Sequence, residues 1–224
     1  MGFREIYLPL LILTTLLIFI KARRKLGFFF SLIFILYLTF NLVIEFIAGI
    51  AFYYKVNNII LYNMDILIEG LTFCYALYYL HRSPLIKGLL KITATIFILF
   101  WAVDFFFIQK EYEFNTYSYL LSSIVLSGFS LATIYIFVFE KTFKDPFHNF
   151  FFWTSIGILF CYLGNIPYLM FYNILFQKAI LIAYSLTIIS QIVNSILYIM
   201  IIIGILYHRR PSNEISKLNL DSFL

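Results

Sequence analysis

The sequence has few charged residues and lacks the composition of a soluble protein. Asp, Glu, Lys and Arg make up only 12% of its 224 residues, whereas soluble domains have about 25%. Hydrophobic residues reach 63%, and no soluble fold of this length has enough interior to bury so much apolar surface. The composition therefore predicts an integral membrane protein.

Residues that several membrane chemistries need are absent or misplaced. The last apolar segment contains no lysine between residues 180 and 206, which excludes a retinal Schiff base. No glycine-rich phosphate loop, GxSxG or CxxC motif occurs. The two cysteines, Cys74 and Cys161, lie inside apolar segments and predict packing residues without a disulfide framework. The sequence thus names no reaction.

Seven apolar segments are long enough to cross a membrane, for which about 20 residues are needed. They cover about residues 3–20, 28–52, 59–80, 86–108, 116–139, 148–172 and 179–207. Backbone polar groups in lipid must pair within their own segment, so each segment has to be a helix. We predict an all-α polytopic membrane protein, a bundle of seven transmembrane helices over residues 1–208, followed by a short tail at 209–224.

The basic residues are divided unevenly between the two sides of this bundle. Of the sixteen Lys and Arg residues, only Arg4, Lys55, Lys110 and Lys178 fall on the side of the N-terminus. Because Lys and Arg accumulate on the cytoplasmic side, we predict an N-terminus outside and a cytoplasmic C-terminus. The net charge of +5 therefore serves topology, and we expect no nucleic-acid partner. A tail of sixteen residues is too short for a catalytic domain, so signalling requires a partner.

Polar side chains recur on single faces of several predicted helices. Asp65 and Glu69 are four residues apart, and at about 1.5 Å per residue they lie roughly 9 Å and 15 Å below the outer face. Glu45 and Asp104 fall within about 10 Å of that face. Acids facing lipid cost several kcal/mol, so we expect these side chains in the bundle interior. The predicted ligand-binding residues of an outward-opening polar cavity are Glu45, Tyr62, Asp65, Glu69, Asp104, Asn165, Gln191 and Asn194.

Several arrangements satisfy such carboxyls: bound protons, a bound cation, or water in the cavity. If a metal binds there, all-oxygen ligation favours a hard cation such as Ca²⁺, Mg²⁺ or Mn²⁺. Polar residues also join membrane helices by hydrogen bonds without any ligand, and this alternative stays open. His81, His148 and His208 are placed at the opposite ends of their helices from the acids, which argues against a zinc-dependent lipid hydrolase. Asn173 is expected to be solvated.

Three stretches carry a resemblance to a known group of proteins: NNIILYNMDILIEG (57–70), FFWTSIGILFCYLGNIPY (151–168) and IVNSILYIM (192–200). They resemble uncharacterised small seven-span membrane proteins of Bacteroidota-type bacteria. The matching positions are Glu45, Tyr62, Asn63, Glu69, Trp153, Gly157, Gly164, Pro167, Asn194 and Tyr198. Ile60 stands where the group has Trp, and Asp65 and Asp104 are additions to its pattern. The resemblance implies a bacterial inner-membrane location and a partner such as a sensor kinase, and it implies no catalytic residues or cofactor.

Three functional hypotheses follow. The first is a sensor that binds a small ligand or a cation in the cavity and signals through a cytoplasmic partner. The second is a proton- or cation-coupled transporter in which Glu69 is the coupling site. The third, ranked below both, is an intramembrane lipid enzyme that uses paired carboxylates as acid and base.

Overall fold

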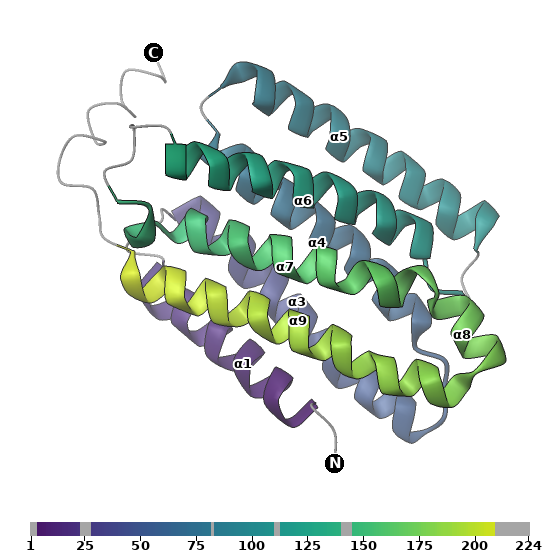
Figure 1. Cartoon of the computed structure of the whole chain (residues 1–224). Helices are drawn as coiled ribbons and strands as arrows, with labels where there is room; N and C mark the ends of the chain where they lie inside the picture. Colours follow the sequence, from purple (N-terminus) through teal and green to yellow (C-terminus); the bar gives the residue numbers. More distant parts are fainter. Residues whose placement is uncertain (1–3, 23–27, 82, 110–112, 140–144, 209–224) are drawn as a thin grey trace.

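The structure, a computed structural model, describes residues 4–22, 28–81, 83–109, 113–139 and 145–208. Every regular element in these residues is helical (Figure 1). The elements are α1 (Arg4–Leu17), η1 (Ile18–Ala22), α3 (Phe28–Tyr53), α4 (Ile59–Leu80), α5 (Pro84–Val103), η2 (Asp104–Ile108), α6 (Thr116–Phe139), η3 (Pro146–His148), α7 (Phe150–Met170), α8 (Tyr172–Lys178) and α9 (Ile180–Tyr207). The turns η1 and η2 are π-helical and extend α1 and α5.

Six helices in the described residues are long and apolar enough to cross a membrane. They are Phe30–Ala51, Ile59–Leu80, Pro84–Ile108, Thr116–Phe139, Phe150–Met170 and Thr187–Tyr207. The first apolar segment, Leu8–Ile20, is shorter. The chain is therefore a multi-pass helical membrane protein, as its composition predicts, while a seventh span and the orientation stay predictions.

Local signals set the helix boundaries at one end of the bundle. Pro84 opens α5, where its missing N–H is not needed. The Asn149 side chain accepts a hydrogen bond from Phe151 N at 2.9 Å and so caps α7. His208, just after α9, accepts from Phe150 N at 3.2 Å and ties α9 to the start of α7. We call this the His81 end, after the residue that follows α4, and the opposite one the Lys55 end.

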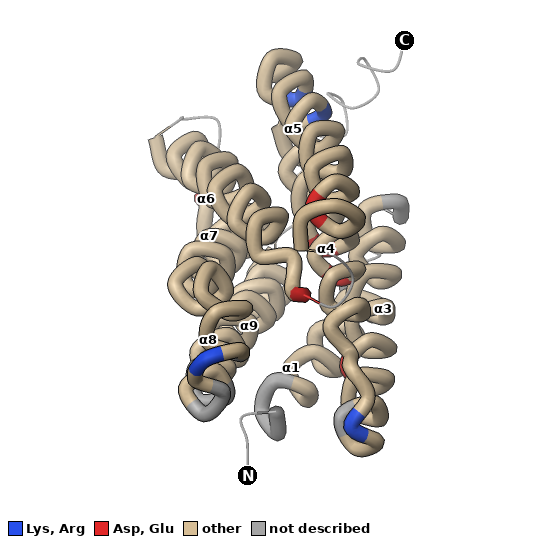
Figure 2. Tube along the Cα trace, turned by 90° about the vertical axis from the view of Figure 1, so that its right-hand side faces the viewer, with Lys and Arg blue, Asp and Glu red and all other residues tan. Residues whose placement is uncertain are grey.

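The helices form two layers (Figure 1). In one layer α7 lies between α6 and α9 and packs extensively with both. In the other, α4 packs against α3 and α5, and α1 joins the layers by contacting α3 and α9. Viewed along the helices, α6, α7 and α9 lie on one side and α3, α4 and α5 on the other (Figure 2).

Glycine permits the close approach of α7 and α9. A Cβ atom at Gly164 would lie 2.6 Å from Cγ1 of Val193, and one at Gly157 would lie 3.0 Å from Cδ1 of Leu197. Small residues at such positions let membrane helices pack tightly where lipid offers no hydrophobic driving force. The α6–α7–α9 layer is consequently the more closely packed of the two.

Phenylalanine fills the interior of the bundle toward the His81 end. The rings of Phe34 and Phe73 are 6.3 Å apart, those of Phe34 and Phe150 6.0 Å, and those of Phe30 and Phe150 5.9 Å. All four side chains are at most 1% exposed. We call these four residues the aromatic plug, because they fill the space between α3, α4 and α7 with apolar rings.

Candidate functional site

Three half-buried carboxyl groups from α3 and α4 lie near enough for their charges to interact, and we call Glu45, Asp65 and Glu69 the acidic trio. Asp65 and Glu69 are one turn apart on α4, and the charges of Glu69 and Glu45 both act on Asp65. The buried Oδ1 atom of Asp65 has no hydrogen-bond partner among the described residues. Neither α3 nor α4 contains Lys or Arg. In Figure 2 the acidic positions lie toward the middle of the view, whereas the Lys and Arg drawn in blue lie on α5, on α8 and just beyond α3.

Glu69 joins the two layers of the bundle. The Tyr162 hydroxyl of α7 donates a hydrogen bond to its carboxylate. The Tyr162 ring stacks on that of Tyr119 from α6, with centroids 5.5 Å apart and planes at 20°. Phe73 of the aromatic plug packs edge-on against the Tyr162 ring at 6.1 Å. Glu69 is thus linked by Tyr162 to the α6–α7–α9 layer.

A chain of hydrogen bonds continues from the tyrosines to α9. The side chains of Tyr119 and Asn165 are hydrogen-bonded. Asn165 Nδ2 lies 3.4 Å from Asn194 Oδ1, and the Cys161 thiol donates to the same oxygen at 2.9 Å. Cys161 therefore has a polar contact beyond the packing role that the sequence predicts. The inter-layer network consists of Glu69, Tyr119, Cys161, Tyr162, Asn165 and Asn194.

Asp104, the fourth predicted intramembrane acid, lies apart from the trio. Its Oδ2 accepts hydrogen bonds from the backbone N of Ser118 at 2.9 Å and from the Ser118 hydroxyl at 2.6 Å. A carboxylate that receives the free N–H groups of a first helical turn acts as an N-cap, and here it comes from the preceding helix. Asp104 is fully buried in η2, and its carboxylate thus lies at the start of α6.

Tyr62 and Gln191 lie at the edges of the site. Tyr62 is half-buried on α4 beside Tyr168 of α7. Gln191 is half-buried on α9, one turn before Asn194. Their ligand-binding role stays a prediction.

A groove with a volume of about 710 Å³ lies between α1 and α3. Of the predicted site residues, Glu45 lines it, and the other lining residues are apolar or aromatic apart from one glycine. We call it the α1–α3 groove. It differs from the polar cavity that the sequence predicts because most of the polar side chains face other helices instead.

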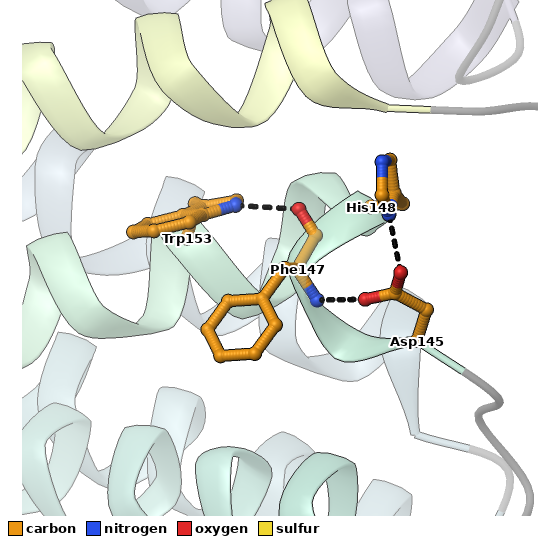
Figure 3. Close-up of polar contacts among 4 residues, drawn as sticks. All are labelled: Asp145, Phe147, His148 and Trp153. Carbon is orange, nitrogen blue, oxygen red and sulfur yellow. Dashed lines mark hydrogen bonds and ion pairs between the residues drawn. The ribbon is translucent and has the colours of Figure 1, made fainter.

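No group of three or more His, Cys, Asp or Glu side chains in the described part of the chain is placed to hold a metal ion. The histidines lie at helix ends, as predicted. His148 of η3 pairs with Asp145, whose other oxygen accepts from Phe147 N at 3.0 Å, and Trp153 donates to the Phe147 carbonyl at 2.8 Å (Figure 3). These contacts order the turn before α7 and do not include the acidic trio.

His81 is more buried than a residue at a membrane surface, with 5% of its surface exposed. The Thr133 hydroxyl donates to the Phe129 carbonyl at 2.8 Å, so its oxygen accepts from His81 Nε2 at 2.9 Å. This contact joins α4 to α6 and selects the tautomer that carries the proton on Nε2. Burial, and secondarily the charge of Lys87, lower the pKa of His81.

Sequence reasoning missed two asparagines that organise the Lys55 end. Buried Asn63 donates to the Glu113 carbonyl at 2.8 Å and accepts from Asn115 N at 2.9 Å. Asn173 of α8 accepts from Phe114 N at 3.2 Å and donates to the Phe114 carbonyl at 2.9 Å. The expectation that Asn173 is solvated is wrong, because its amide pairs with both backbone groups of one loop residue. Only the hydrogen-bonding capacity of asparagine hinted at this role.

Comparison with known proteins adds no assignment to this geometry. No family model matches the chain, and neither the curated proteins nor the solved structures give a significant match. The resemblance to seven-span proteins of Bacteroidota-type bacteria therefore stays a prediction.

Proposed function

We propose that this chain senses a cation, either a proton or a small organic ammonium ion, at the acidic trio. The observation that carries the proposal is half-buried Asp65, on which the charges of Glu69 and Glu45 act and whose buried Oδ1 atom has no hydrogen-bond partner in the described structure. Like charges in a medium of low polarity have to be neutralised by a proton or by a cation. An ammonium ion suits this site because a single carboxylate and aromatic rings bind it without a set of metal ligands.

The inter-layer network supplies a route by which occupancy changes the structure. The Glu69 carboxylate accepts a hydrogen bond from the Tyr162 hydroxyl, and this bond joins the two layers. A proton or cation on the trio removes acceptor strength from Glu69 and weakens that link. A ligand shifts an equilibrium only by binding two states differently, and this contact differs between the occupied and the empty trio. Movement of α4 against α7 is the resulting signal.

The aromatic plug favours sensing over transport. On the His81 side of Glu69, the rings of Phe73, Phe34 and Phe150 occupy the space between α3, α4 and α7, and none of these three offers a hydrogen-bonding group. A proton or cation that crosses a membrane needs polar groups along its path. Transport remains the second candidate, because Glu69 lies at the middle of α4 where a coupling site belongs.

The proposed topology connects the site to a partner. In this proposal α1 with η1 is a seventh span, the N-terminus is outside and the C-terminus is in the cytoplasm of a bacterium, at its inner membrane. Glu45 and Asp65 then lie in the outer half of the bundle and Glu69 near its middle, and a partner such as a sensor kinase contacts the cytoplasmic loops or the tail. The tail at 209–224 lies outside the described residues.

Thermal unfolding with methylammonium, followed by a flux assay, tests the proposal. We expect methylammonium to stabilise the wild type by about 2.7 kcal/mol at one hundred times its Kd, and Glu69→Gln and Asp65→Asn to abolish this response. Glu113→Gln, which changes an exposed carboxylate, serves as the control and keeps the response. Liposomes with an internal pH dye are expected to show no proton flux. Flux that Glu69→Gln abolishes would favour the transporter, and responses equal in all variants would contradict both.

A further inference from the structure

The α1–α3 groove is apolar along its length. Leu8 and Ile12 of α1 form one wall, and Leu42, Phe46 and Ile50 of α3 form the other. Its volume of about 710 Å³ lies within the range of sites that hold drug-sized molecules, about 300–1,000 Å³. In the proposed topology α1 and α3 both lie in the membrane, so a molecule dissolved in the bilayer reaches the groove from the side.

Glu45 gives this apolar groove a negative charge. It is the one charged side chain among the described residues that line the groove. Gly49 lies one turn further along α3, and a Cβ atom at this position would meet nothing within 4 Å. Tyr53 and Tyr54, 80% and 70% exposed, mark the mouth of the groove at the Lys55 end. A carboxylate, aromatic rings and unoccupied space thus occur together in the α1–α3 groove.

The same carboxylate belongs to the acidic trio. The charge of Glu45 acts on Asp65, so its side chain is near both the groove and the interior of the bundle. A cation held at Glu45 is therefore next to the group on which the proposed sensing depends. Glu45 connects the bilayer side of α3 with the trio.

We propose that the α1–α3 groove is a lateral binding site for an amphiphilic organic cation, an alkyl chain with an ammonium head, and delivers that head to the trio. This inference rests on the proposed function and names the ligand class. The apolar walls accept the alkyl chain and exclude hydrophilic molecules, while Glu45 selects a positive head group and rejects a negative one. Aromatic rings such as Phe46 add attraction for an ammonium group.

Dodecylamine, dodecanoate and methylammonium are the probes, titrated against the full chain in lipid nanodiscs. Gly49→Leu adds a side chain to the groove at a position where a Cβ atom meets nothing within 4 Å. Gly128→Leu is its matched control, because a Cβ atom at Gly128 also meets nothing within 4 Å and this residue is on α6. We expect Gly49→Leu to weaken dodecylamine binding at least tenfold, Gly128→Leu to leave it unchanged, and Glu45→Gln to weaken it. Methylammonium binding is expected to survive Gly49→Leu, and dodecanoate is expected not to compete.

Other outcomes overturn the inference and separate it from the proposed function. If methylammonium acts through Glu69 but Gly49→Leu leaves dodecylamine binding unchanged, the sensing proposal stands and the groove is not the site. If Gly49→Leu weakens dodecylamine binding while methylammonium never binds, the groove does not lead to a cation-binding trio. If the wild type is a dimer that Gly49→Leu dissociates, a second copy of the chain covers the groove instead.

Discussion

Asn63→Ala is expected to destabilise the protein by about 2–4 kcal/mol, because it removes two hydrogen bonds that hold the α5–α6 loop against α4. Asn115 is fully buried, so its backbone N–H is left without a partner at a cost of about 1–3 kcal/mol. Glu113 is exposed, so water replaces the Asn63 amide as the partner of its carbonyl, and the loss of this second hydrogen bond costs only about 1 kcal/mol. The Trp101 indole bonds to the Asn63 backbone carbonyl and is retained.

Thermal unfolding of the purified protein, followed by tryptophan fluorescence, measures this effect. At about 2–4 °C per kcal/mol for a chain of this size, the Tm of Asn63→Ala should fall by about 5–15 °C. Asn57→Ala is the matched control, since exposed Asn57 accepts one hydrogen bond, from Ile59 N at 2.9 Å, and its loss should cost under about 1 kcal/mol. Equal Tm values for the two variants would refute the role of Asn63 in holding the loop.

Three further perturbations test other parts of the structure. Asp104→Ala removes the cap of α6 and should cost about 1–2 kcal/mol in chemical unfolding, with Asp104→Asn costing less; no loss in either would contradict the cap. Gly164→Ala should cost about 1–3 kcal/mol, because its Cβ would lie 2.6 Å from Val193, whereas Gly128→Ala should fold normally. The pKa of His81 is lowered by folding, so below about pH 6.5 the unfolded chain takes up a proton that the folded chain resists. The free energy of unfolding should therefore fall between pH 7 and pH 5, and it should fall less steeply in His81→Gln. Equal pH dependence in the wild type and in His81→Gln would exclude His81 as the cause.

The sequence predicts the helices well because their signals are local. The predicted segments 59–80 and 116–139 coincide with α4 and α6, since apolar length and flanking polar turns define a span without knowledge of the fold. The first segment is less clear, because α1 passes into a π-helical turn and its apolar stretch, Leu8–Ile20, is shorter than the other spans.

The candidate site is harder to predict because helical spacing gives depth and face but not the neighbouring helix. Asp65 and Glu69 share a face of α4, as their spacing requires. Asp104 has a similar expected depth, yet its carboxylate reaches Ser118 at the start of α6. Tyr162 and Tyr119 had no distinguishing pattern among 18 tyrosines, and only the packing of α6, α7 and α4 brings them to Glu69.

Infrared difference spectroscopy on adding methylammonium tests the central claim most directly, because the carbonyl band of a protonated carboxyl group is distinct from that of a carboxylate. If the trio binds either a proton or an ammonium ion, methylammonium should remove a protonated-carboxyl band in the wild type. The same change should be absent in Glu69→Gln and in Asp65→Asn and present in Glu113→Gln. A spectrum in which methylammonium alters no carboxyl band, or alters it equally in all four proteins, would contradict cation binding at the acidic trio.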